Sequence, residues 1–299
     1  MRILVSGSTG LVGTAVCGAY RAGGHTVNAL VRAGRAPSRG DVRWDYASGE
    51  FDSAAAEAAD AVIHLAGHSI ADGRLDEKHR QMVLESRVEG TRHLASHLLK
   101  LKQKPGVLVA ASAVGYYGDR GDEELTEQSA PGSNFLAEVA QQWEAESSRA
   151  TEGGIRVVLL RFGVILSPDG GALAKMLMPF RLGLGGRVGS GRQWWPWISM
   201  PDVVKLVRHA VDGDSLSGAV NAVAPNPVRN FEFTKTLGKV LRRPTLFPAP
   251  AFALRLALGQ TADLLLLSSQ RALPGRLQGM DYKFLHADLE SALRAVLGR

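Results

Sequence analysis

Cysteine is almost absent from this chain of 299 residues, and its scarcity excludes one way of stabilising a fold. The single cysteine, Cys17, cannot form a disulfide within the chain, so the fold must depend on a buried core, for which the chain is long enough. A lone cysteine in a helix-like stretch is usually a small buried apolar residue and not a catalytic thiol. The lack of disulfides suits a reducing compartment, and we expect a cytoplasmic protein.

Long apolar runs and clusters of basic residues are also missing. No apolar stretch approaches the roughly 20 residues that a membrane-spanning helix requires. The formal net charge is +6, but the positive charges are scattered and do not form the basic and aromatic runs of a nucleic-acid-binding surface. We therefore expect no membrane, nucleic acid or metal as a partner, and a small anionic ligand accounts for the positive charge equally well.

Short apolar runs alternate with longer segments of helical periodicity. The apolar runs are rich in valine, isoleucine and leucine without polar alternation, which is typical of strands buried on both faces. This order predicts an α/β fold with a Rossmann-type, doubly wound parallel sheet. The expected strands are Ile3–Ser6, Val27–Val31, Ala61–Leu65, Val107–Ala111, Val157–Leu160 and Val220–Val223, and the expected helices are Leu11–Ala22, Asp52–Ala59, Asp76–Lys102, Phe135–Arg149 and Pro201–Val211.

The alternation of apolar runs and helical segments ends near Pro225. We expect residues 1–224 to form the Rossmann domain and residues 225–299 a small, mostly helical C-terminal domain that walls a substrate cleft or mediates contacts. Its expected helices are one capped by Asn230 and ending near Leu241, one from about Ala251, and one over Ala287–Leu297. Before it, the glycine-rich residues 170–191 predict a loop over a site or a mobile lid.

A glycine motif follows the first expected strand and opens the first expected helix. A tight turn, close approach of the backbone to a pyrophosphate, and helix–strand contact without a Cβ all require glycine at such a place. The free N–H groups of the helix start then favour phosphate binding. A plain tight turn is the simpler explanation, but the position of the motif favours a dinucleotide. Its residues are Gly7-Ser8-Thr9-Gly10-Leu11-Val12-Gly13.

The end of the second expected strand carries arginines where a site that prefers NAD usually has an acid. Arg32 and Arg35 follow Val31, and no aspartate or glutamate stands there. Guanidinium groups suit a ribose 2′-phosphate, which distinguishes NADP from NAD. Two solvated loop arginines are the alternative explanation. We predict NADP(H) as the cofactor.

Further motifs resemble the extended short-chain dehydrogenase/reductases, and more narrowly an NAD-dependent epimerase/dehydratase-like family of uncertain function with a small C-terminal domain of unknown function. The resemblance spans essentially the whole chain. The motifs that carry it, besides the glycine motif, are Trp44-Asp45-Tyr46, His64-Leu65-Ala66-Gly67, Ser86-Arg87-Val88-Glu89-Gly90-Thr91, Ala111-Ser112-Ala113-Val114-Gly115-Tyr116-Tyr117-Gly118, Phe135-Leu136-Ala137-Glu138 with Trp143-Glu144, Asn221-Ala222-Val223-Ala224-Pro225 and Leu273-Pro274-Gly275-Arg276-Leu277.

The resemblance implies a place in the site for each of several residues. It gives Ser112, at a strand end, the role of the catalytic serine of the superfamily. The implied cofactor contacts are Gly7, Thr9, Leu11 and Val12 at the pyrophosphate, with Gly10 and Gly13 of the same motif; Asp45 at the adenine; Leu65, Ala66 and Gly67 beneath the ribose and nicotinamide; and Phe162, Gly163 and Val164 at the nicotinamide amide.

The superfamily also needs a tyrosine and a lysine four residues apart on one helix face, the lysine lowering the pKa of the phenol. In this sequence the two positions hold Leu136 and Ala140, or Phe135 and Val139 if no gap is allowed. Both groups are missing in either alignment. The usual proton relay therefore cannot operate, and the apolar helix face indicates core packing.

Other residues are candidates for the proton transfer. Tyr116 and Tyr117 follow Ser112 closely, although tyrosines after a strand commonly pack against the next loop. His68 follows the His64–Gly67 motif and would lie beside the nicotinamide, where imidazole can exchange protons near neutral pH; a loop histidine without a partner is more often simply polar. His64 itself, within a strand, is expected to be buried.

Gly185–Ile198 concentrates glycine, arginine and three of the five tryptophans. Such a segment can close on an anionic or planar ligand, or it can anchor the two domains to each other. Two functions remain open. One is an NADP(H)-dependent oxidoreductase or epimerase acting on a small carbonyl or hydroxyl substrate, and the other is a catalytically silent NADP(H) sensor. We favour the enzyme, as a monomer or homodimer.

Overall fold

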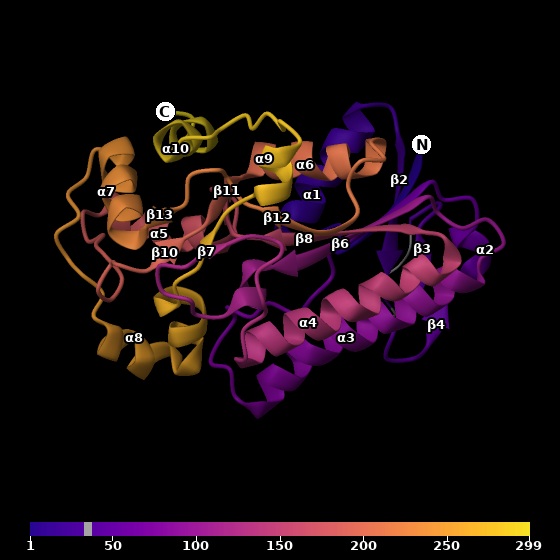
Figure 1. Ribbon diagram of the computed structural model, residues 1–299, viewed down its shortest axis with the longest axis horizontal. Coiled ribbons are helices and arrows are strands. Elements are labelled where there is room, and N and C mark those ends of the chain that lie inside the picture. Colours follow the sequence, from indigo (N-terminus) through magenta and orange to yellow (C-terminus); the bar gives the residue numbers. More distant parts are fainter. Residues whose placement is uncertain (33–37) are drawn as a thin grey trace.

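The computed structural model describes residues 1–32 and 38–299, and a large sheet lies at its centre (Figure 1). Eight strands of this described part form the sheet, and all are parallel to their neighbours except the last, which is antiparallel. In spatial order they are β12 (Gly218–Ala222), β8 (Arg156–Phe162), β6 (Val107–Ala113), β5 (Ala61–His64), β1 (Arg2–Ser6), β2 (Thr26–Val31), β3 (Val42–Asp45) and β4 (Glu50–Phe51).

The chain winds outward from β1 in both directions. It first passes through β2, β3 and β4, and then returns to β5 on the other side of β1 before it continues to β6, β8 and β12. This doubly wound order confirms the predicted α/β, Rossmann-type fold. It also leaves a crevice outside the carboxyl ends of β1 and β5, where the order reverses, and ligands of such sheets bind there.

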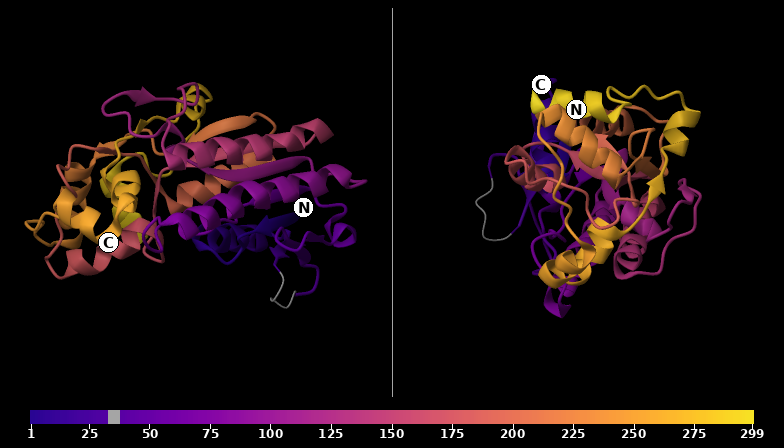
Figure 2. Two further views of the ribbon diagram at one scale, coloured as in Figure 1. Left: turned by 90° about the horizontal axis from the view of Figure 1, so that it is seen from below. Right: turned by 90° about the vertical axis from the view of Figure 1, so that its left-hand side faces the viewer.

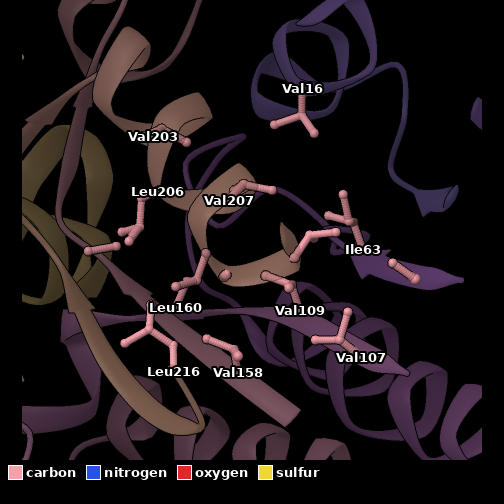
Figure 3. Packing of buried hydrophobic residues seen from close by; sticks show 14 of the residues in the cluster. Val16, Ile63, Val107, Val109, Val158, Leu160, Val203, Leu206, Val207 and Leu216 are labelled. Carbon is pink, nitrogen blue, oxygen red and sulfur yellow. The ribbon is translucent and has the colours of Figure 1, made fainter. Parts of the chain in front are cut away.

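Helices cover both faces of the sheet (Figure 1). One face carries α1 (Leu11–Ala22) and α6 (Met200–Asp212), and the other carries α3 (Glu77–Lys100) and α4 (Phe135–Ser148). Figure 3 shows Val16 of α1 and Val203 and Val207 of α6 facing strand residues such as Val109 and Leu160, all of them buried. Burial of a valine or leucine side chain is worth about 1.5–3 kcal/mol, so this contact fixes α1, and the loop before it, onto the sheet.

The starts of these helices differ in one respect. Asp76 accepts a hydrogen bond from the His79 N–H at the start of α3, and Asn134 accepts one from the Ala137 N–H at the start of α4. Helix α1 instead begins after Gly10, which has no side chain to cap it. The first N–H groups of α1 are therefore left for another acceptor, because the start of a helix has no partners of its own.

The C-terminal part forms a lobe at one end of the sheet (Figures 1 and 2). A third buried cluster holds it together, and this cluster includes residues from both sides of the predicted boundary at 224, so the division stays a prediction. The helices and short strands at this end are α5 (Gly171–Arg181), α7 (Asn230–Leu241), α8 (Ala251–Leu258), α10 (Leu289–Leu297), β9 (Val164–Leu166), β10 (Trp194–Trp195), β11 (Trp197–Ser199) and β13 (Val228–Arg229). Helix α9 (Gly275–Gly279) instead packs on β12 and joins the main core through Leu277, and β14 (Arg271–Ala272) pairs with β7 (Glu124–Leu125).

The expected loop over residues 170–191 is wrong for its first half, which is helix α5. Leu173, Leu177 and Phe180 are buried at the spacing of one helix face and join the third cluster. The glycines stand at the two ends of the segment, so they bound the helix and do not interrupt it. Residues 182–191 do lack regular structure.

Two other local expectations are corrected. Asn230 does not cap its helix: Arg229 precedes α7, and the buried Asn230 carboxamide accepts a hydrogen bond from the Val188 N–H at 2.8 Å. The helix expected over residues 52–59 is only α2 (Ser53–Ala56), because the chain turns to positive φ at Ala58. Strand β3 was missing from the predicted set, and it is only four residues long.

Candidate cofactor site

A cavity of about 860 Å³ opens at the crevice predicted by the strand order. It runs from the ends of β2 and β3, past the glycine motif, to the loop after β5 and the start of α3. Many predicted cofactor residues meet in its wall. The lining residues are Gly7, Ser8, Thr9, Gly10, Leu30, Val31, Arg32, Trp44, Asp45, Tyr46, Ala47, Leu65, Ala66, Gly67, His68, Ser69, Met82, Glu85 and Ser86.

The glycine motif is packed too tightly for side chains. Gly7 has a φ of +66°, and a Cβ on it would lie 2.8 Å from the Leu65 carbonyl carbon. A Cβ on Gly13 would lie 2.1 Å from the Gly7 carbonyl oxygen. The first glycine therefore allows the turn and the approach to the loop after β5, and the third allows α1 to pack against that turn. This is the cradle that a pyrophosphate needs at a helix start.

A buried chain of hydrogen bonds fixes the loop after β5. The Ser6 hydroxyl accepts hydrogen bonds from the Leu65 and Ala66 N–H groups and lies 2.6 Å from His64 Nδ1. His64 Nε2 lies 2.9 Å from the Thr91 hydroxyl, and burial lowers the pKa of His64 to about 4, so the ring is neutral. The prediction that His64 is a buried histidine with satisfied hydrogen bonds is confirmed.

One end of the cavity carries a guanidinium group that suits an adenosine 2′-phosphate. Exposed Arg32 lies there next to Asp45 and Tyr46. The Asp45 carboxylate accepts a hydrogen bond from the Ala47 N–H at 3.0 Å, which shapes the turn after β3. Arg35 lies outside the described residues, and its role stays a prediction.

His68 lies at the opposite end, and two neighbouring residues of α3 hold its backbone. Its N–H donates to the Ser86 hydroxyl at 2.9 Å, and its carbonyl accepts from the Arg87 guanidinium at 2.8 Å. The half-buried imidazole packs edge-on against His79, with ring centres 5.2 Å apart. Of the residues predicted for proton transfer, His68 is the one that the structure places in the cavity wall.

Ser112 belongs to a buried polar network at the end of β6. Its hydroxyl donates to Glu144 Oε1 at 2.6 Å, and Arg161 forms a two-pronged ion pair with the same carboxylate, both bonds being 2.7 Å. Burial alone would lower the pKa of Arg161, but the hydrogen bonds and charge of Glu144, with those of Tyr117, raise it above its usual value. Sequence reasoning missed this pair, and Ser112 itself does not line the cavity.

The two predicted tyrosines flank Arg161. The Tyr117 hydroxyl donates to the Asn221 carboxamide at 2.7 Å and accepts from Arg161 at 2.9 Å, and burial raises the pKa of Tyr117 to about 12. Tyr117 is therefore a poor proton donor. Half-buried Tyr116 stacks on the Arg161 guanidinium, 3.5 Å from the ring centre. Neither tyrosine lines the cavity.

The helix face that lacks the tyrosine and lysine is part of the core. Leu136, Val139, Ala140 and Trp143 of α4 are buried, as the sequence predicted, and Phe135 of the same face is partly buried. Arg87 of α3 stacks on the Trp143 ring at 5.1 Å, so a cation lies beside this apolar face.

The remaining predicted cofactor residues do not line the cavity. Leu11, Val12 and Gly13 belong to α1, while Phe162, Gly163 and Val164 cross from β8 to β9. Gly163 is close-packed, since a Cβ on it would lie 2.5 Å from the Pro196 carbonyl oxygen. These assignments stay predictions.

The tryptophan-rich segment is largely an anchor. Trp195 and Trp197 are buried in the third cluster together with Phe233 of α7. Trp194 is half-buried between the guanidinium groups of Arg229 and Arg271, at 4.6 and 4.8 Å. All three tryptophans are thus held by contacts within the protein, which favours an anchoring role over a ligand-closing loop.

Within residues 1–32 and 38–299, no group of three or more histidine, cysteine, aspartate or glutamate side chains could hold a metal ion. Over the same ranges, every helix is too short or too polar to cross a membrane.

The sheet order, glycine motif and cavity define a short-chain dehydrogenase/reductase-type dinucleotide fold. The chain belongs to the NAD dependent epimerase/dehydratase family, whose profile matches residues 3–222, and a domain of unknown function, DUF1731, matches residues 249–296. Its curated relatives include an epimerase family protein of Mycobacterium bovis, 41% identical over 97% of this chain and 96% of the relative, and YfhF of Bacillus subtilis, 38% identical over 99% and 98%. The crystal structure of the human epimerase family protein SDR39U1 with NADPH covers 100% of both chains at 34% identity, with a TM-score of 0.91.

Proposed function

We propose that this protein binds NADP(H) in the cavity at the carboxyl ends of β1, β2 and β5. The observation that carries the proposal is the uncapped start of α1, which opens behind a glycine cradle into a cavity with Arg32 at one end. The helix start suits a pyrophosphate, and the guanidinium suits a 2′-phosphate. The human relative crystallised with NADPH supports the same cofactor.

The choice between NADPH and NADH tests the role of Arg32. We expect NADPH to bind at least about tenfold more tightly than NADH, and Arg32→Ala to narrow this gap by weakening NADPH alone. Isothermal titration of both cofactors against both proteins measures the four dissociation constants. Arg39→Ala, an exposed arginine a few residues further on, is the matched control. Equal affinities of the unaltered protein for NADPH and NADH would refute the assignment.

We further propose that the protein is an oxidoreductase or epimerase acting on a small carbonyl or hydroxyl substrate. The bound cofactor supplies or accepts a hydride. His68, in the cavity wall, is the group that we assign to proton exchange with the substrate oxygen, because its backbone is held on both sides by Ser86 and Arg87. Ser112 would first have to release Glu144 before its hydroxyl could reach a substrate oxygen.

A second candidate function is a silent NADP(H) sensor. Its support is specific: the Ser112 and Tyr117 hydroxyls are both committed to the buried network, and the two positions on α4 are apolar. A protein that had lost the proton relay but kept its cofactor cradle would look like this.

Turnover separates the two candidates. The protein, loaded with NADPH, is offered aldehydes, ketones and quinones, and the nicotinamide absorbance is followed. We expect oxidation of NADPH with some of these compounds, and a loss of at least about 100-fold in rate for His68→Asn with unchanged NADPH affinity. His25→Asn is the control, because His25 directly precedes β2 and the cavity lies at the other end of that strand. Tight NADPH binding with no turnover across the screen would favour the sensor.

A further inference from the structure

Two guanidinium groups of the sheet domain are covered to different degrees and differ in their partners: Arg161 is buried, and Arg87, which packs against the cavity loop at Gly67, is half-buried. Arg161 is neutralised by the buried carboxylate of Glu144. Arg87 forms no ion pair with any carboxylate of the described ranges. The sequence also indicates that Arg87 has no acidic partner on its own helix face. The residues three and four positions away along α3 are all uncharged: Val83, Leu84, Gly90 and Thr91.

The contacts of Arg87 hold it against the cofactor loop. Its guanidinium donates to the carbonyl oxygens of His68 at 2.8 Å and Val83 at 3.4 Å, and stacks on Trp143. A Cβ on Gly67 would lie 3.1 Å from the guanidinium carbon, so Gly67 is the thin layer between this group and the cavity.

The positive charge persists despite its burial. Removing an unpaired charge from water is costly even when the residue is only half-buried, and desolvation lowers the pKa of Arg87 to about 10. At neutral pH the group is still protonated. The two carbonyl oxygens accept hydrogen bonds from the guanidinium but carry no net charge, so they do not neutralise it; Glu85, two residues earlier on α3, is the acidic residue that this helix places in the cavity wall.

The topology places this cation under one particular half of the dinucleotide. Arg32, Asp45 and Tyr46, after β2 and β3, mark the adenosine end, and the glycine cradle after β1 marks the pyrophosphate. The other nucleotide must then extend over the loop after β5, where Gly67 and His68 form the wall. Arg87 lies beneath that loop.

We propose that Arg87 biases the site toward the reduced cofactor. The inference depends on the proposed binding of NADP(H). The nicotinamide ring carries a positive charge when oxidised and none when reduced, whereas the phosphates are the same in both forms. A fixed cation beneath the ring therefore disfavours NADP⁺ relative to NADPH. Removing the charge therefore strengthens NADP⁺ binding relative to NADPH.

The test measures dissociation constants for NADPH, NADP⁺ and 2′,5′-ADP, the last of which lacks the nicotinamide. The unaltered protein is compared with Arg87→Met, which keeps an apolar stem, Arg87→Gln, which keeps a donor for the His68 carbonyl, and Arg87→Lys, which keeps the charge. Arg92→Met, five residues along the same helix and paired on the surface with Glu89 and Glu146, removes the same charge far from the cavity. Circular dichroism confirms that each variant is folded.

We expect the unaltered protein to bind NADPH at least about threefold more tightly than NADP⁺, and the ratio to fall about tenfold in Arg87→Met and Arg87→Gln. Arg87→Lys and Arg92→Met should keep the ratio, and 2′,5′-ADP affinity should not change in any variant. Equal binding of NADPH and NADP⁺ by the unaltered protein overturns the inference, whether or not a variant folds, and so does an unchanged ratio in a folded Arg87→Gln. If NADPH, NADP⁺ and 2′,5′-ADP all fail to bind the unaltered protein, the proposed function itself is wrong.

Discussion

Glu144→Gln is expected to destabilise the folded protein by about 3–5 kcal/mol, the range found when one partner of a buried ion pair is removed. The side chains of Arg161 and Glu144 are 4% and 10% exposed, so water cannot solvate the guanidinium after the carboxylate has been removed. The substitution is nearly isosteric, and it leaves Arg161 buried without a counter-charge. The Ser112 hydroxyl loses a charged acceptor at the same time.

Urea unfolding followed by circular dichroism measures this effect, and the same helix offers a control. Glu146→Gln removes a carboxylate from α4 that pairs at the surface with Arg92 and Arg149, and we expect it to cost less than about 1 kcal/mol. Replacing the whole pair, as in Glu144→Leu with Arg161→Met, should recover part of the loss, because no charge then stays buried. If Glu144→Gln unfolds at the same urea concentration as Glu146→Gln, the pair does not stabilise the fold.

The parts that the sequence predicts correctly share a local signal. The parallel strands that were predicted are mostly apolar runs, because both of their faces are covered. The glycine motif is recognised by its spacing and by its place after the first of these runs. Where the signal was not local, prediction failed. Helix α5 was not predicted, because the glycines at its two ends made the whole segment resemble a loop. Leu173, Leu177 and Phe180 nevertheless have the spacing of one helix face.

The polar network around Ser112 shows a second reason for failure. Ser112 and Arg161 stand opposite each other because β6 and β8 pair in one particular register. Glu144 contacts both because α4 packs over these two strands. No spacing in the sequence encodes this meeting. Arg87 is an intermediate case: its lack of acidic neighbours three and four residues away was visible, but its position under Gly67 required the fold.

The cradle itself gives the largest expected effect on binding. Gly13→Ala places a Cβ 2.1 Å from the Gly7 carbonyl oxygen and 2.8 Å from the Ser8 Cα. Both are backbone atoms, so no side chain can move aside, and either the turn or the start of α1 must shift. Because the turn and the helix start together form the proposed pyrophosphate site, we expect NADPH affinity to fall by at least about 100-fold, equivalent to about 2.7 kcal/mol.

Gly18→Ala on the same helix separates this effect from a general sensitivity of α1 to substitution. A Cβ on Gly18 meets nothing within 4 Å, so the variant should bind NADPH normally and gain up to about 1 kcal/mol of stability from the better helix propensity of alanine. Urea unfolding first establishes a temperature at which both variants are folded. NADPH is then titrated into each variant at that temperature, and the two dissociation constants are compared. Unchanged affinity in a folded Gly13→Ala would place the pyrophosphate elsewhere, because a shift of several tenths of an ångström in the cradle cannot leave a ligand held by its backbone N–H groups unaffected.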